Sequence, residues 1–125
     1  YEITAKCHNL RKLDLYIREE IKELKEEYLP SCLEYMHLNY NNIKAFKIEK
    51  LKNLKELHMA NCKLASFDMG RNNSLEILVL CYNDLDQFEL KGNQSLKRLH
   101  LYMNRLKSFD LEGNSSLDDL RLEYN

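Results

Sequence analysis

The sequence predicts a single solenoid domain of mostly β structure, in which short parallel strands stack one above another. Two observations carry this prediction. Five leucines stand 21 residues apart, and the alternation of apolar and polar residues after each of them is typical of a strand. All four phenylalanines also share one column of the repeat, which random placement would very seldom produce. The leucines are Leu33, Leu54, Leu75, Leu96 and Leu117, and the phenylalanines are Phe46, Phe67, Phe88 and Phe109.

Read from each of these leucines, the repeat is L-x-x-L-x-L-x-x-N-x-L-x-x-F-x-L, and its columns are numbered here from that first leucine. One repeat can bury its apolar side only against its neighbours, so like residues stack into a continuous core. Because the loop back to the next copy is short, the L-x-L strands must lie parallel, about 4.8 Å apart. The regular repeats are 33–53, 54–74, 75–95 and 96–116, and residues 117–125 form an incomplete one.

The charges in column two give an independent check on this register. Their signs alternate without a break along the chain. In a parallel sheet in register these side chains are neighbours, so each charge meets opposite charges. The alternation includes Arg11, which predicts a genuine first turn around residues 10–15. The column reads Arg11, Glu34, Lys55, Glu76, Lys97 and Asp118.

Asparagines occupy two positions at which the chain turns. An asparagine amide both donates and accepts hydrogen bonds, so it can satisfy backbone groups of adjacent turns that would otherwise be buried unpaired. We therefore interpret both sets as structural ladders rather than as ligand sites. Column nine holds Asn41, Cys62, Asn83, Asn104 and Asn125, and the second set is Asn72, Asn93 and Asn114.

The L-x-x-L-x-L-x-x-N-x-L motif, followed by F-x-L and a second asparagine, resembles the leucine-rich repeat superfamily. Its nested 21-residue form is similar to a subclass found mainly in bacterial proteins. The resemblance is close over 33–125 and loose over 10–32. It implies a right-handed solenoid of the α/β superhelix class, whose concave face is a parallel sheet that binds proteins or peptides. The F-x-L half implies short extended segments on the convex face, and hence a flatter arc.

The two ends depart from the repeat. Residues 1–32 are predicted to form an irregular, partly helical capping turn that shields the first regular repeat from solvent. Within it, the stretch 18–28 has Ile21, Leu24 and Tyr28 spaced for one face of a helix, and Pro30 prevents its continuation. No polar cap follows the last leucines, which predicts an open C-terminal edge through which chains could self-associate.

Tyrosine and histidine concentrate on the strand face formed by columns three, five and seven, with column eight at its rim. Such side chains combine apolar area with a hydrogen-bonding tip, as recognition surfaces do, although aromatic residues also suit strands for packing alone. We predict that this face binds a protein or peptide. The candidate partner-binding residues are Tyr16, Tyr35, His37, Tyr40, His58, Tyr82, His100, Tyr102 and Tyr124.

A metal site is the sharpest alternative, because His37 and His58 are expected about 5 Å apart on adjacent strands. Val79 interrupts this column, and no carboxylate or cysteine is an obvious third ligand, so we expect neither a metal nor another cofactor. Catalysis is not expected either, because Cys81 has no histidine base beside it on its strand and the shallow sheet offers no pocket. A structural spacer that assembles end to end is the second functional class.

Composition narrows the range of partners. The net charge of −1 provides no excess of either sign to attract nucleic acid. No apolar run approaches the roughly 18 residues of a membrane span, so membrane insertion is not expected. Cysteines 7, 32, 62 and 81 contain no C-x-x-C pair and are expected to be reduced. The outer-side charges Lys47, Asp68, Glu89 and Asp110 are interpreted as a solvated surface rather than a calcium or partner site.

Overall fold

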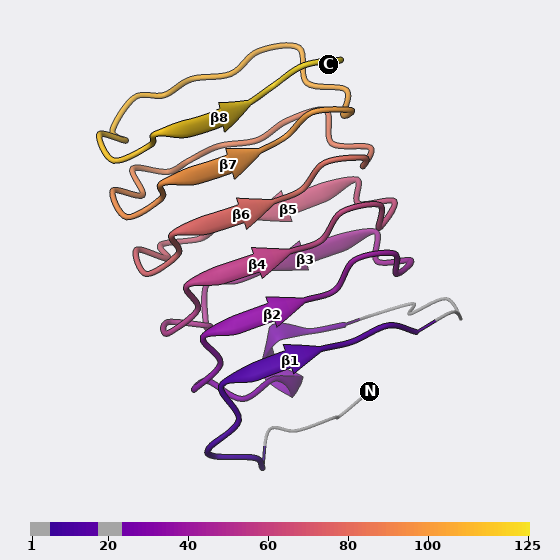
Figure 1. Ribbon diagram of the computed structural model, residues 1–125, viewed down its shortest axis with the longest axis vertical. Helices are drawn as coiled ribbons and strands as arrows, with labels where there is room; N and C mark the ends of the chain where they lie inside the picture. Colours follow the sequence, from indigo (N-terminus) through magenta and orange to yellow (C-terminus); the bar gives the residue numbers. More distant parts are fainter. Residues whose placement is uncertain (1–5, 18–23) are drawn as a thin grey trace.

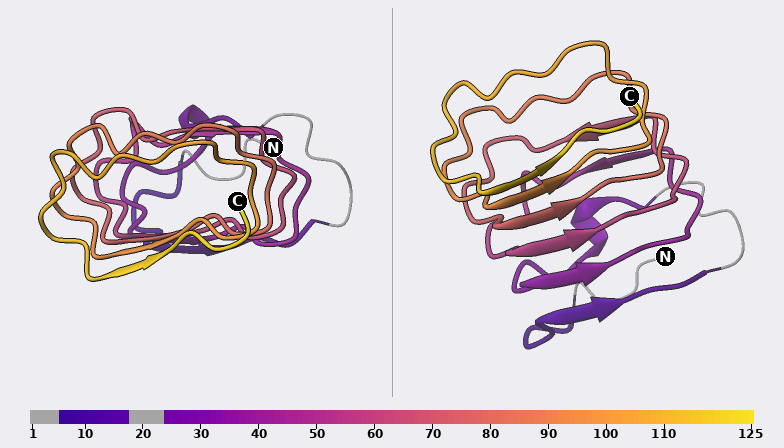
Figure 2. Two further views of the ribbon diagram at one scale, coloured as in Figure 1. Left: turned by 90° about the horizontal axis from the view of Figure 1, so that it is seen from above. Right: turned by 45° about the horizontal axis from the view of Figure 1, so that its top comes forward.

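A computed structural model describes residues 6–17 and 24–125 and shows a parallel β solenoid of about five turns (Figure 1). Seen from above, the turns superimpose as one flattened loop, with the main strands along one long side (Figure 2). These strands form a six-stranded parallel sheet. In sheet order they are β1 (Lys12–Asp14), β2 (Tyr35–His37), β4 (Glu56–His58), β6 (Ile77–Val79), β7 (Arg98–His100) and β8 (Asp119–Arg121).

The register of the sheet is the one that the repeat predicts. Each apolar column-four residue pairs with its equivalent on the next strand, as Leu57 does with Leu78 and Leu78 with Leu99. The first turn predicted around residues 10–15 is confirmed, because Leu13 of β1 pairs with Met36 of β2. Successive strands therefore stack like residues, and the buried leucines of columns one, four and six form one continuous core.

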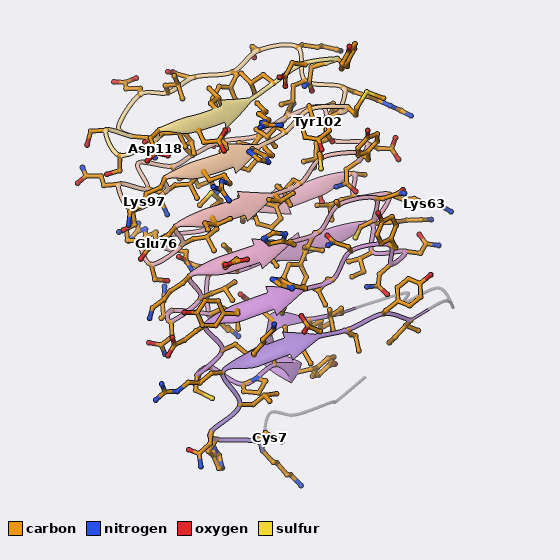
Figure 3. All side chains as sticks on the ribbon, in the orientation of Figure 1. Cys7, Lys63, Glu76, Lys97, Tyr102 and Asp118 are labelled. Carbon is orange, nitrogen blue, oxygen red and sulfur yellow. The ribbon has the colours of Figure 1, made fainter. Side chains whose placement is uncertain are left out.

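The alternating charges of column two lie along one edge of the sheet, where Glu76, Lys97 and Asp118 follow one another up the stack (Figure 3). Lys97 Nζ is 2.8 Å from Glu76 Oε2, and Lys55 Nζ is 2.9 Å from Glu34 Oε2. The ammonium of Lys55 lowers the pKa of Glu34, and the ammonium of Lys97 lowers the pKa of Glu76. Oppositely charged residues of column two on neighbouring turns are therefore in direct contact in these two pairs.

Both asparagine sets are structural ladders, as predicted. In the column-nine set, Asn104 Nδ2 donates to the carbonyls of Leu80 and Leu101 at 2.9 Å, one on the preceding turn and one on its own. In the second set, Asn93 Nδ2 donates to the carbonyl of Asn72 and Asn114 Nδ2 to that of Asn93, both at 2.7 Å. These bonds satisfy buried backbone groups where no strand does so.

The opposite side of the loop is only partly strand. β3 (Ala45–Lys47) and β5 (Ser66–Asp68) pair in parallel, as the F-x-L motif predicts. The equivalent segments around Phe88 and Phe109 are not paired as strands, but the residues on either side of each phenylalanine are exposed, the alternation that the prediction of short extended segments requires. The rings of Phe67 and Phe88, and of Phe88 and Phe109, stack with centroids 6.2 Å apart. In these upper turns the phenylalanine rings are thus in contact while the backbone around them is not paired as strands.

The predicted N-terminal helix is not confirmed. Residues 18–23, which include Ile21, lie outside the described residues, and residues 24–25 are not helical. Only Glu26–Tyr28 turns, as the 3₁₀ helix η1. Leu29 has φ −106° and ψ 145°, the extended conformation that Pro30 imposes on the residue before it. Leu24 and Leu29 are nevertheless buried and pack against the core, so this segment covers apolar surface without a regular helix.

Two further sequence expectations can be compared with the described residues. All four cysteines are free thiols, as expected. Within residues 6–17 and 24–125, no helix is both long and apolar enough to cross a membrane.

Candidate binding surface

The outward-pointing side of the six-stranded sheet, called the sheet face below, consists of columns three, five and seven with column eight at its end. Successive side chains of a strand point to opposite sides, so Glu56 and His58 share this face while Leu57 between them is fully buried. The histidines of column five, His37, His58 and His100, are all half-buried here. The sheet face therefore presents partly shielded polar side chains above a leucine layer.

Column eight has an unusual backbone. All five of its residues from β2 onward adopt the left-handed conformation, with φ between 56° and 62°. This conformation ends each strand and turns the chain so that the column-nine side chain points into the core. Asparagine tolerates it best among residues with a side chain, whereas larger residues adopt it rarely. The column reads Tyr40, Asn61, Tyr82, Met103 and Tyr124.

The exposed apolar side chains gather on the same side. Seven large apolar side chains are exposed among the described residues, and six of them belong to columns three, seven or eight. Five are tyrosines predicted from the sequence, and the sixth, Met103, was missed because only aromatic residues and histidines were sought. Its place in column eight, which also holds three of the exposed tyrosines, was the feature of the sequence that could have identified it. The six are Tyr16, Tyr35, Tyr40, Tyr82, Met103 and Tyr124.

The first group of contacts on this face is centred on Glu56. The rings of His37 and His58 lie on adjacent strands with centroids 4.6 Å apart. Glu56 Oε1 is 3.3 Å from His37 Nε2 and 2.8 Å from His58 Nε2. On the other side of His37, Nδ1 is 2.9 Å from Asp14 Oδ1. Burial is the largest influence on the pKa of His58 and lowers it, and the adjacent His37 lowers it further.

Glu56 was also missed by the sequence reasoning, which found no carboxylate positioned beside the two histidines. It lies two residues before His58 on the same strand, and it occupies the face one strand away from His37. Its position in column three of the repeat could therefore have identified it from the sequence. Among the described residues, His37, Glu56 and His58 are the group of three whose ligand atoms lie close enough together to hold a metal ion.

The second group of contacts lies on β7 and the segment after β6. The rings of Tyr82 and Tyr102 meet edge to face with centroids 5.4 Å apart, and the His100 ring is 6.3 Å from that of Tyr102. His100 Nε2 is also 3.0 Å from Asp119 Oδ2, and this hydrogen bond lowers the pKa of Asp119. Contact with the Cys81 side chain, followed by burial, raises the pKa of Tyr102 to about 12.

Five of the nine candidate residues thus form two separate groups of contacts. His37 and His58 make one group, and Tyr82, His100 and Tyr102 make the other. Val79 occupies the column-five position between them, as the sequence predicts. The remaining candidates, Tyr16, Tyr35, Tyr40 and Tyr124, are exposed side chains around these groups.

One charged residue of the outer side, Asp68, makes contacts within the chain. Asp68 accepts hydrogen bonds from Lys91 Nζ at 2.7 Å and from the backbone N–H of Gly70 at 2.9 Å. The ammonium of Lys91 is the largest influence on the pKa of Asp68 and lowers it. These contacts agree with the interpretation of this side as a solvated surface.

Comparison with known proteins adds no family assignment. No protein-family model matches the chain, and no curated protein is significantly similar to it in sequence. The function must therefore be inferred from the repeat and from the geometry of the sheet face.

Proposed function

We propose that this chain is a leucine-rich-repeat-type recognition module that binds a protein or peptide through its sheet face. The observation that carries the proposal is the concentration of exposed tyrosines on that face, three of them in the left-handed positions of column eight. Exposed apolar side chains that gather on one face of a small domain are typical of interaction sites. Tyrosine contributes large contact area with few rotatable bonds, which suits it to such a role.

The backbone strengthens this inference. A left-handed residue other than glycine or asparagine costs roughly 1–2 kcal/mol relative to its preferred conformation. Asn61 shows that the less costly asparagine fits the column, yet Tyr40, Tyr82 and Tyr124 occupy it in other turns. Strained positions that retain large side chains are a reason to infer a function for those side chains.

The proposal is tested by selecting peptides that bind the full chain from a random phage-displayed library and measuring their affinity for variants. Tyr82→Ala and Tyr102→Ala are expected to weaken binding by about 1–3 kcal/mol each, because central aromatic residues usually dominate an interface. Both side chains lie outside the leucine core, so a melting curve should show nearly unchanged stability.

Two outer-side variants, Lys47→Ala and Glu89→Ala, serve as matched controls and are expected to retain the affinity of the unaltered chain. If the outer-side variants abolish binding while the tyrosine variants do not, the recognition surface lies on the other side of the solenoid. If the library yields no binder and the chain forms end-to-end oligomers in sedimentation experiments, the structural spacer is the better account.

A further inference from the structure

Three side chains of the sheet face converge on one point between β2 and β4. His37, Glu56 and His58 each offer one ligand atom, and these atoms all lie within 4.8 Å of one another. The three side chains are half-buried, with side-chain exposures of 33%, 25% and 27% in that order. They are therefore accessible to an ion from solvent while being held in place by packing.

The two nitrogens of His37 have separate surroundings. Nδ1 is 2.9 Å from Asp14 Oδ1, within the range of an ion pair. Nε2 makes a hydrogen bond with Glu56 Oε1 at 3.3 Å. A carboxylate that fixes the tautomer and orientation of a ligating histidine is the usual outer partner of a metal-bound imidazole.

His58 lacks a satisfactory partner in this arrangement. Its Nε2 is shielded from solvent and makes no hydrogen bond of acceptable geometry, although Glu56 Oε1 is only 2.8 Å away. The Glu56 oxygen is thus close to both ring nitrogens at once. The unpartnered His58 nitrogen therefore faces the carboxylate oxygen to which His37 is hydrogen-bonded, a point at which all three side chains could bind a cation.

We propose that His37, Glu56 and His58 bind one divalent transition-metal ion, and that Zn²⁺ is the ion they suit best. Two imidazole nitrogens and one carboxylate oxygen form a ligand set that zinc accepts with tetrahedral geometry. Bonds of about 2.0–2.1 Å place the ligand atoms of such an ion about 3.3 Å apart. The separation of His37 Nε2 and Glu56 Oε1, 3.3 Å, already matches this value.

Small side-chain rotations complete the site. The 2.8 Å approach of Glu56 to His58 must lengthen slightly, and the separation of the two histidine ligand atoms, at most 4.8 Å, must come to about 3.3 Å. The backbone need not change, because adjacent strands fix the spacing of the two histidines. Three protein ligands leave the fourth position of a tetrahedral ion open to water or to a donor atom of a binding partner. The site goes beyond peptide recognition and does not depend on it.

The test is a calorimetric titration of Zn²⁺ into the full chain without an affinity tag, after removal of metals with a chelator. Accessible thiols, including the exposed Cys7, are first blocked with iodoacetamide under native conditions so that they do not compete for zinc. One equivalent of Zn²⁺ is expected to bind. His37→Ala, His58→Ala and Glu56→Gln should each raise the Kd at least about tenfold, and Asp14→Asn should raise it about 10–100-fold by releasing His37.

His100→Ala is the matched control, because His100 stands in the same column and contacts a carboxylate, Asp119, at 3.0 Å without a second histidine beside it. Its Kd should equal that of the unaltered chain. In NMR spectra, zinc should shift the ring-nitrogen signals of His37 and His58 but not those of His100.

Circular dichroism establishes that each variant is folded. If a histidine variant is not folded, the zinc affinity of Glu56→Gln, which preserves the shape of the side chain, tests the proposal in its place. The proposal is wrong if the unaltered chain and Glu56→Gln bind zinc equally, or if His100→Ala weakens binding as much as His58→Ala.

Discussion

Asn83 links two turns through both ends of its amide: Nδ2 donates to the carbonyl of Met59 at 2.8 Å, and Oδ1 accepts from the backbone N–H of Cys62 at 2.9 Å. The same oxygen also accepts from the N–H of Leu64 at 3.0 Å. The residues that carry these backbone groups are buried, so the groups have few other hydrogen-bond partners. The asparagine ladder thus supplies the hydrogen bonds that the short strands do not reach.

We therefore predict that Asn83→Leu, which keeps the size of the side chain, lowers the free energy of unfolding by about 2–4 kcal/mol. Leucine leaves several buried backbone groups unpaired, and each costs roughly 1–3 kcal/mol, partly relieved by local adjustment. Urea denaturation measures the change. The exposed Asn73→Ala provides a comparison and should stay within about 0.5 kcal/mol of the unaltered chain. An equal loss in both variants would mean that the ladder contributes nothing specific.

Column eight gives a second prediction about the backbone. Tyr40 has φ 62° and an exposed side chain, so its substitution changes mainly the cost of the left-handed conformation. Tyr40→Asn should leave stability unchanged or raise it by up to about 1 kcal/mol, whereas Tyr40→Val should lower it by about 1–2 kcal/mol. Thermal melting of the two variants distinguishes these outcomes. A valine variant as stable as the asparagine variant would contradict the backbone argument.

The charges of column two make a prediction that involves salt. Lys55 Nζ is 2.9 Å from Glu34 Oε2, and Glu76 follows in the next turn, just before β6. Lys55→Glu places three carboxylates in a row and should lower the melting temperature at low ionic strength. Sodium chloride should reduce that loss by screening. The triple exchange Lys55→Glu, Glu34→Lys and Glu76→Lys restores alternation around position 55, and it should recover part of the loss.

The cysteines are expected to differ in reactivity. Burial raises the pKa of the Cys62 thiol, so near pH 8 the nucleophilic thiolate is rarer at Cys62 than at an ordinary cysteine. Cys7 is exposed. Iodoacetamide should therefore modify Cys7 quickly and Cys62 only after unfolding, as mass spectrometry of proteolytic fragments would show. Raising the pH increases the thiolate population but does not remove the steric barrier, so slow labelling of Cys62 should persist. Equal rates at the two sites in folded protein would contradict the buried position of Cys62.

The sequence predicted the parts of the fold in which residues of one column contact each other on neighbouring turns. Leu57 pairs with Leu78, and Lys97 meets Glu76, because an exact repeat brings equivalent positions together whatever the path of the chain between them. The repeat predicts an extended segment around Phe88, and exposure alternates there, but whether such a segment pairs as a strand depends on backbone hydrogen bonds that the repeat alone does not specify. The helix expected before Pro30 depended on helical spacing alone, which does not account for how the segment packs against the core.

The candidate surface was predictable in outline for the same reason. Columns place His37 and His58 on one face, but the approach of Glu56 to both rings depends on side-chain conformations. The contact of Tyr82 with Tyr102 joins two different columns of neighbouring turns, so a column-by-column comparison does not reveal it. Contacts within one column follow from the repeat, whereas contacts between columns require the three-dimensional arrangement.

The alternating edge charges also limit how such a chain can lengthen. The backbone repeats after one turn, but the edge repeats only after two, because Glu76 must be followed by a basic residue and Lys97 by an acidic one. Duplicating a single turn would place two like charges side by side at the new junction, whereas duplicating a pair of turns would keep every neighbour opposite in sign. For gene duplication within this solenoid, the electrostatically neutral unit of growth is therefore a pair of turns.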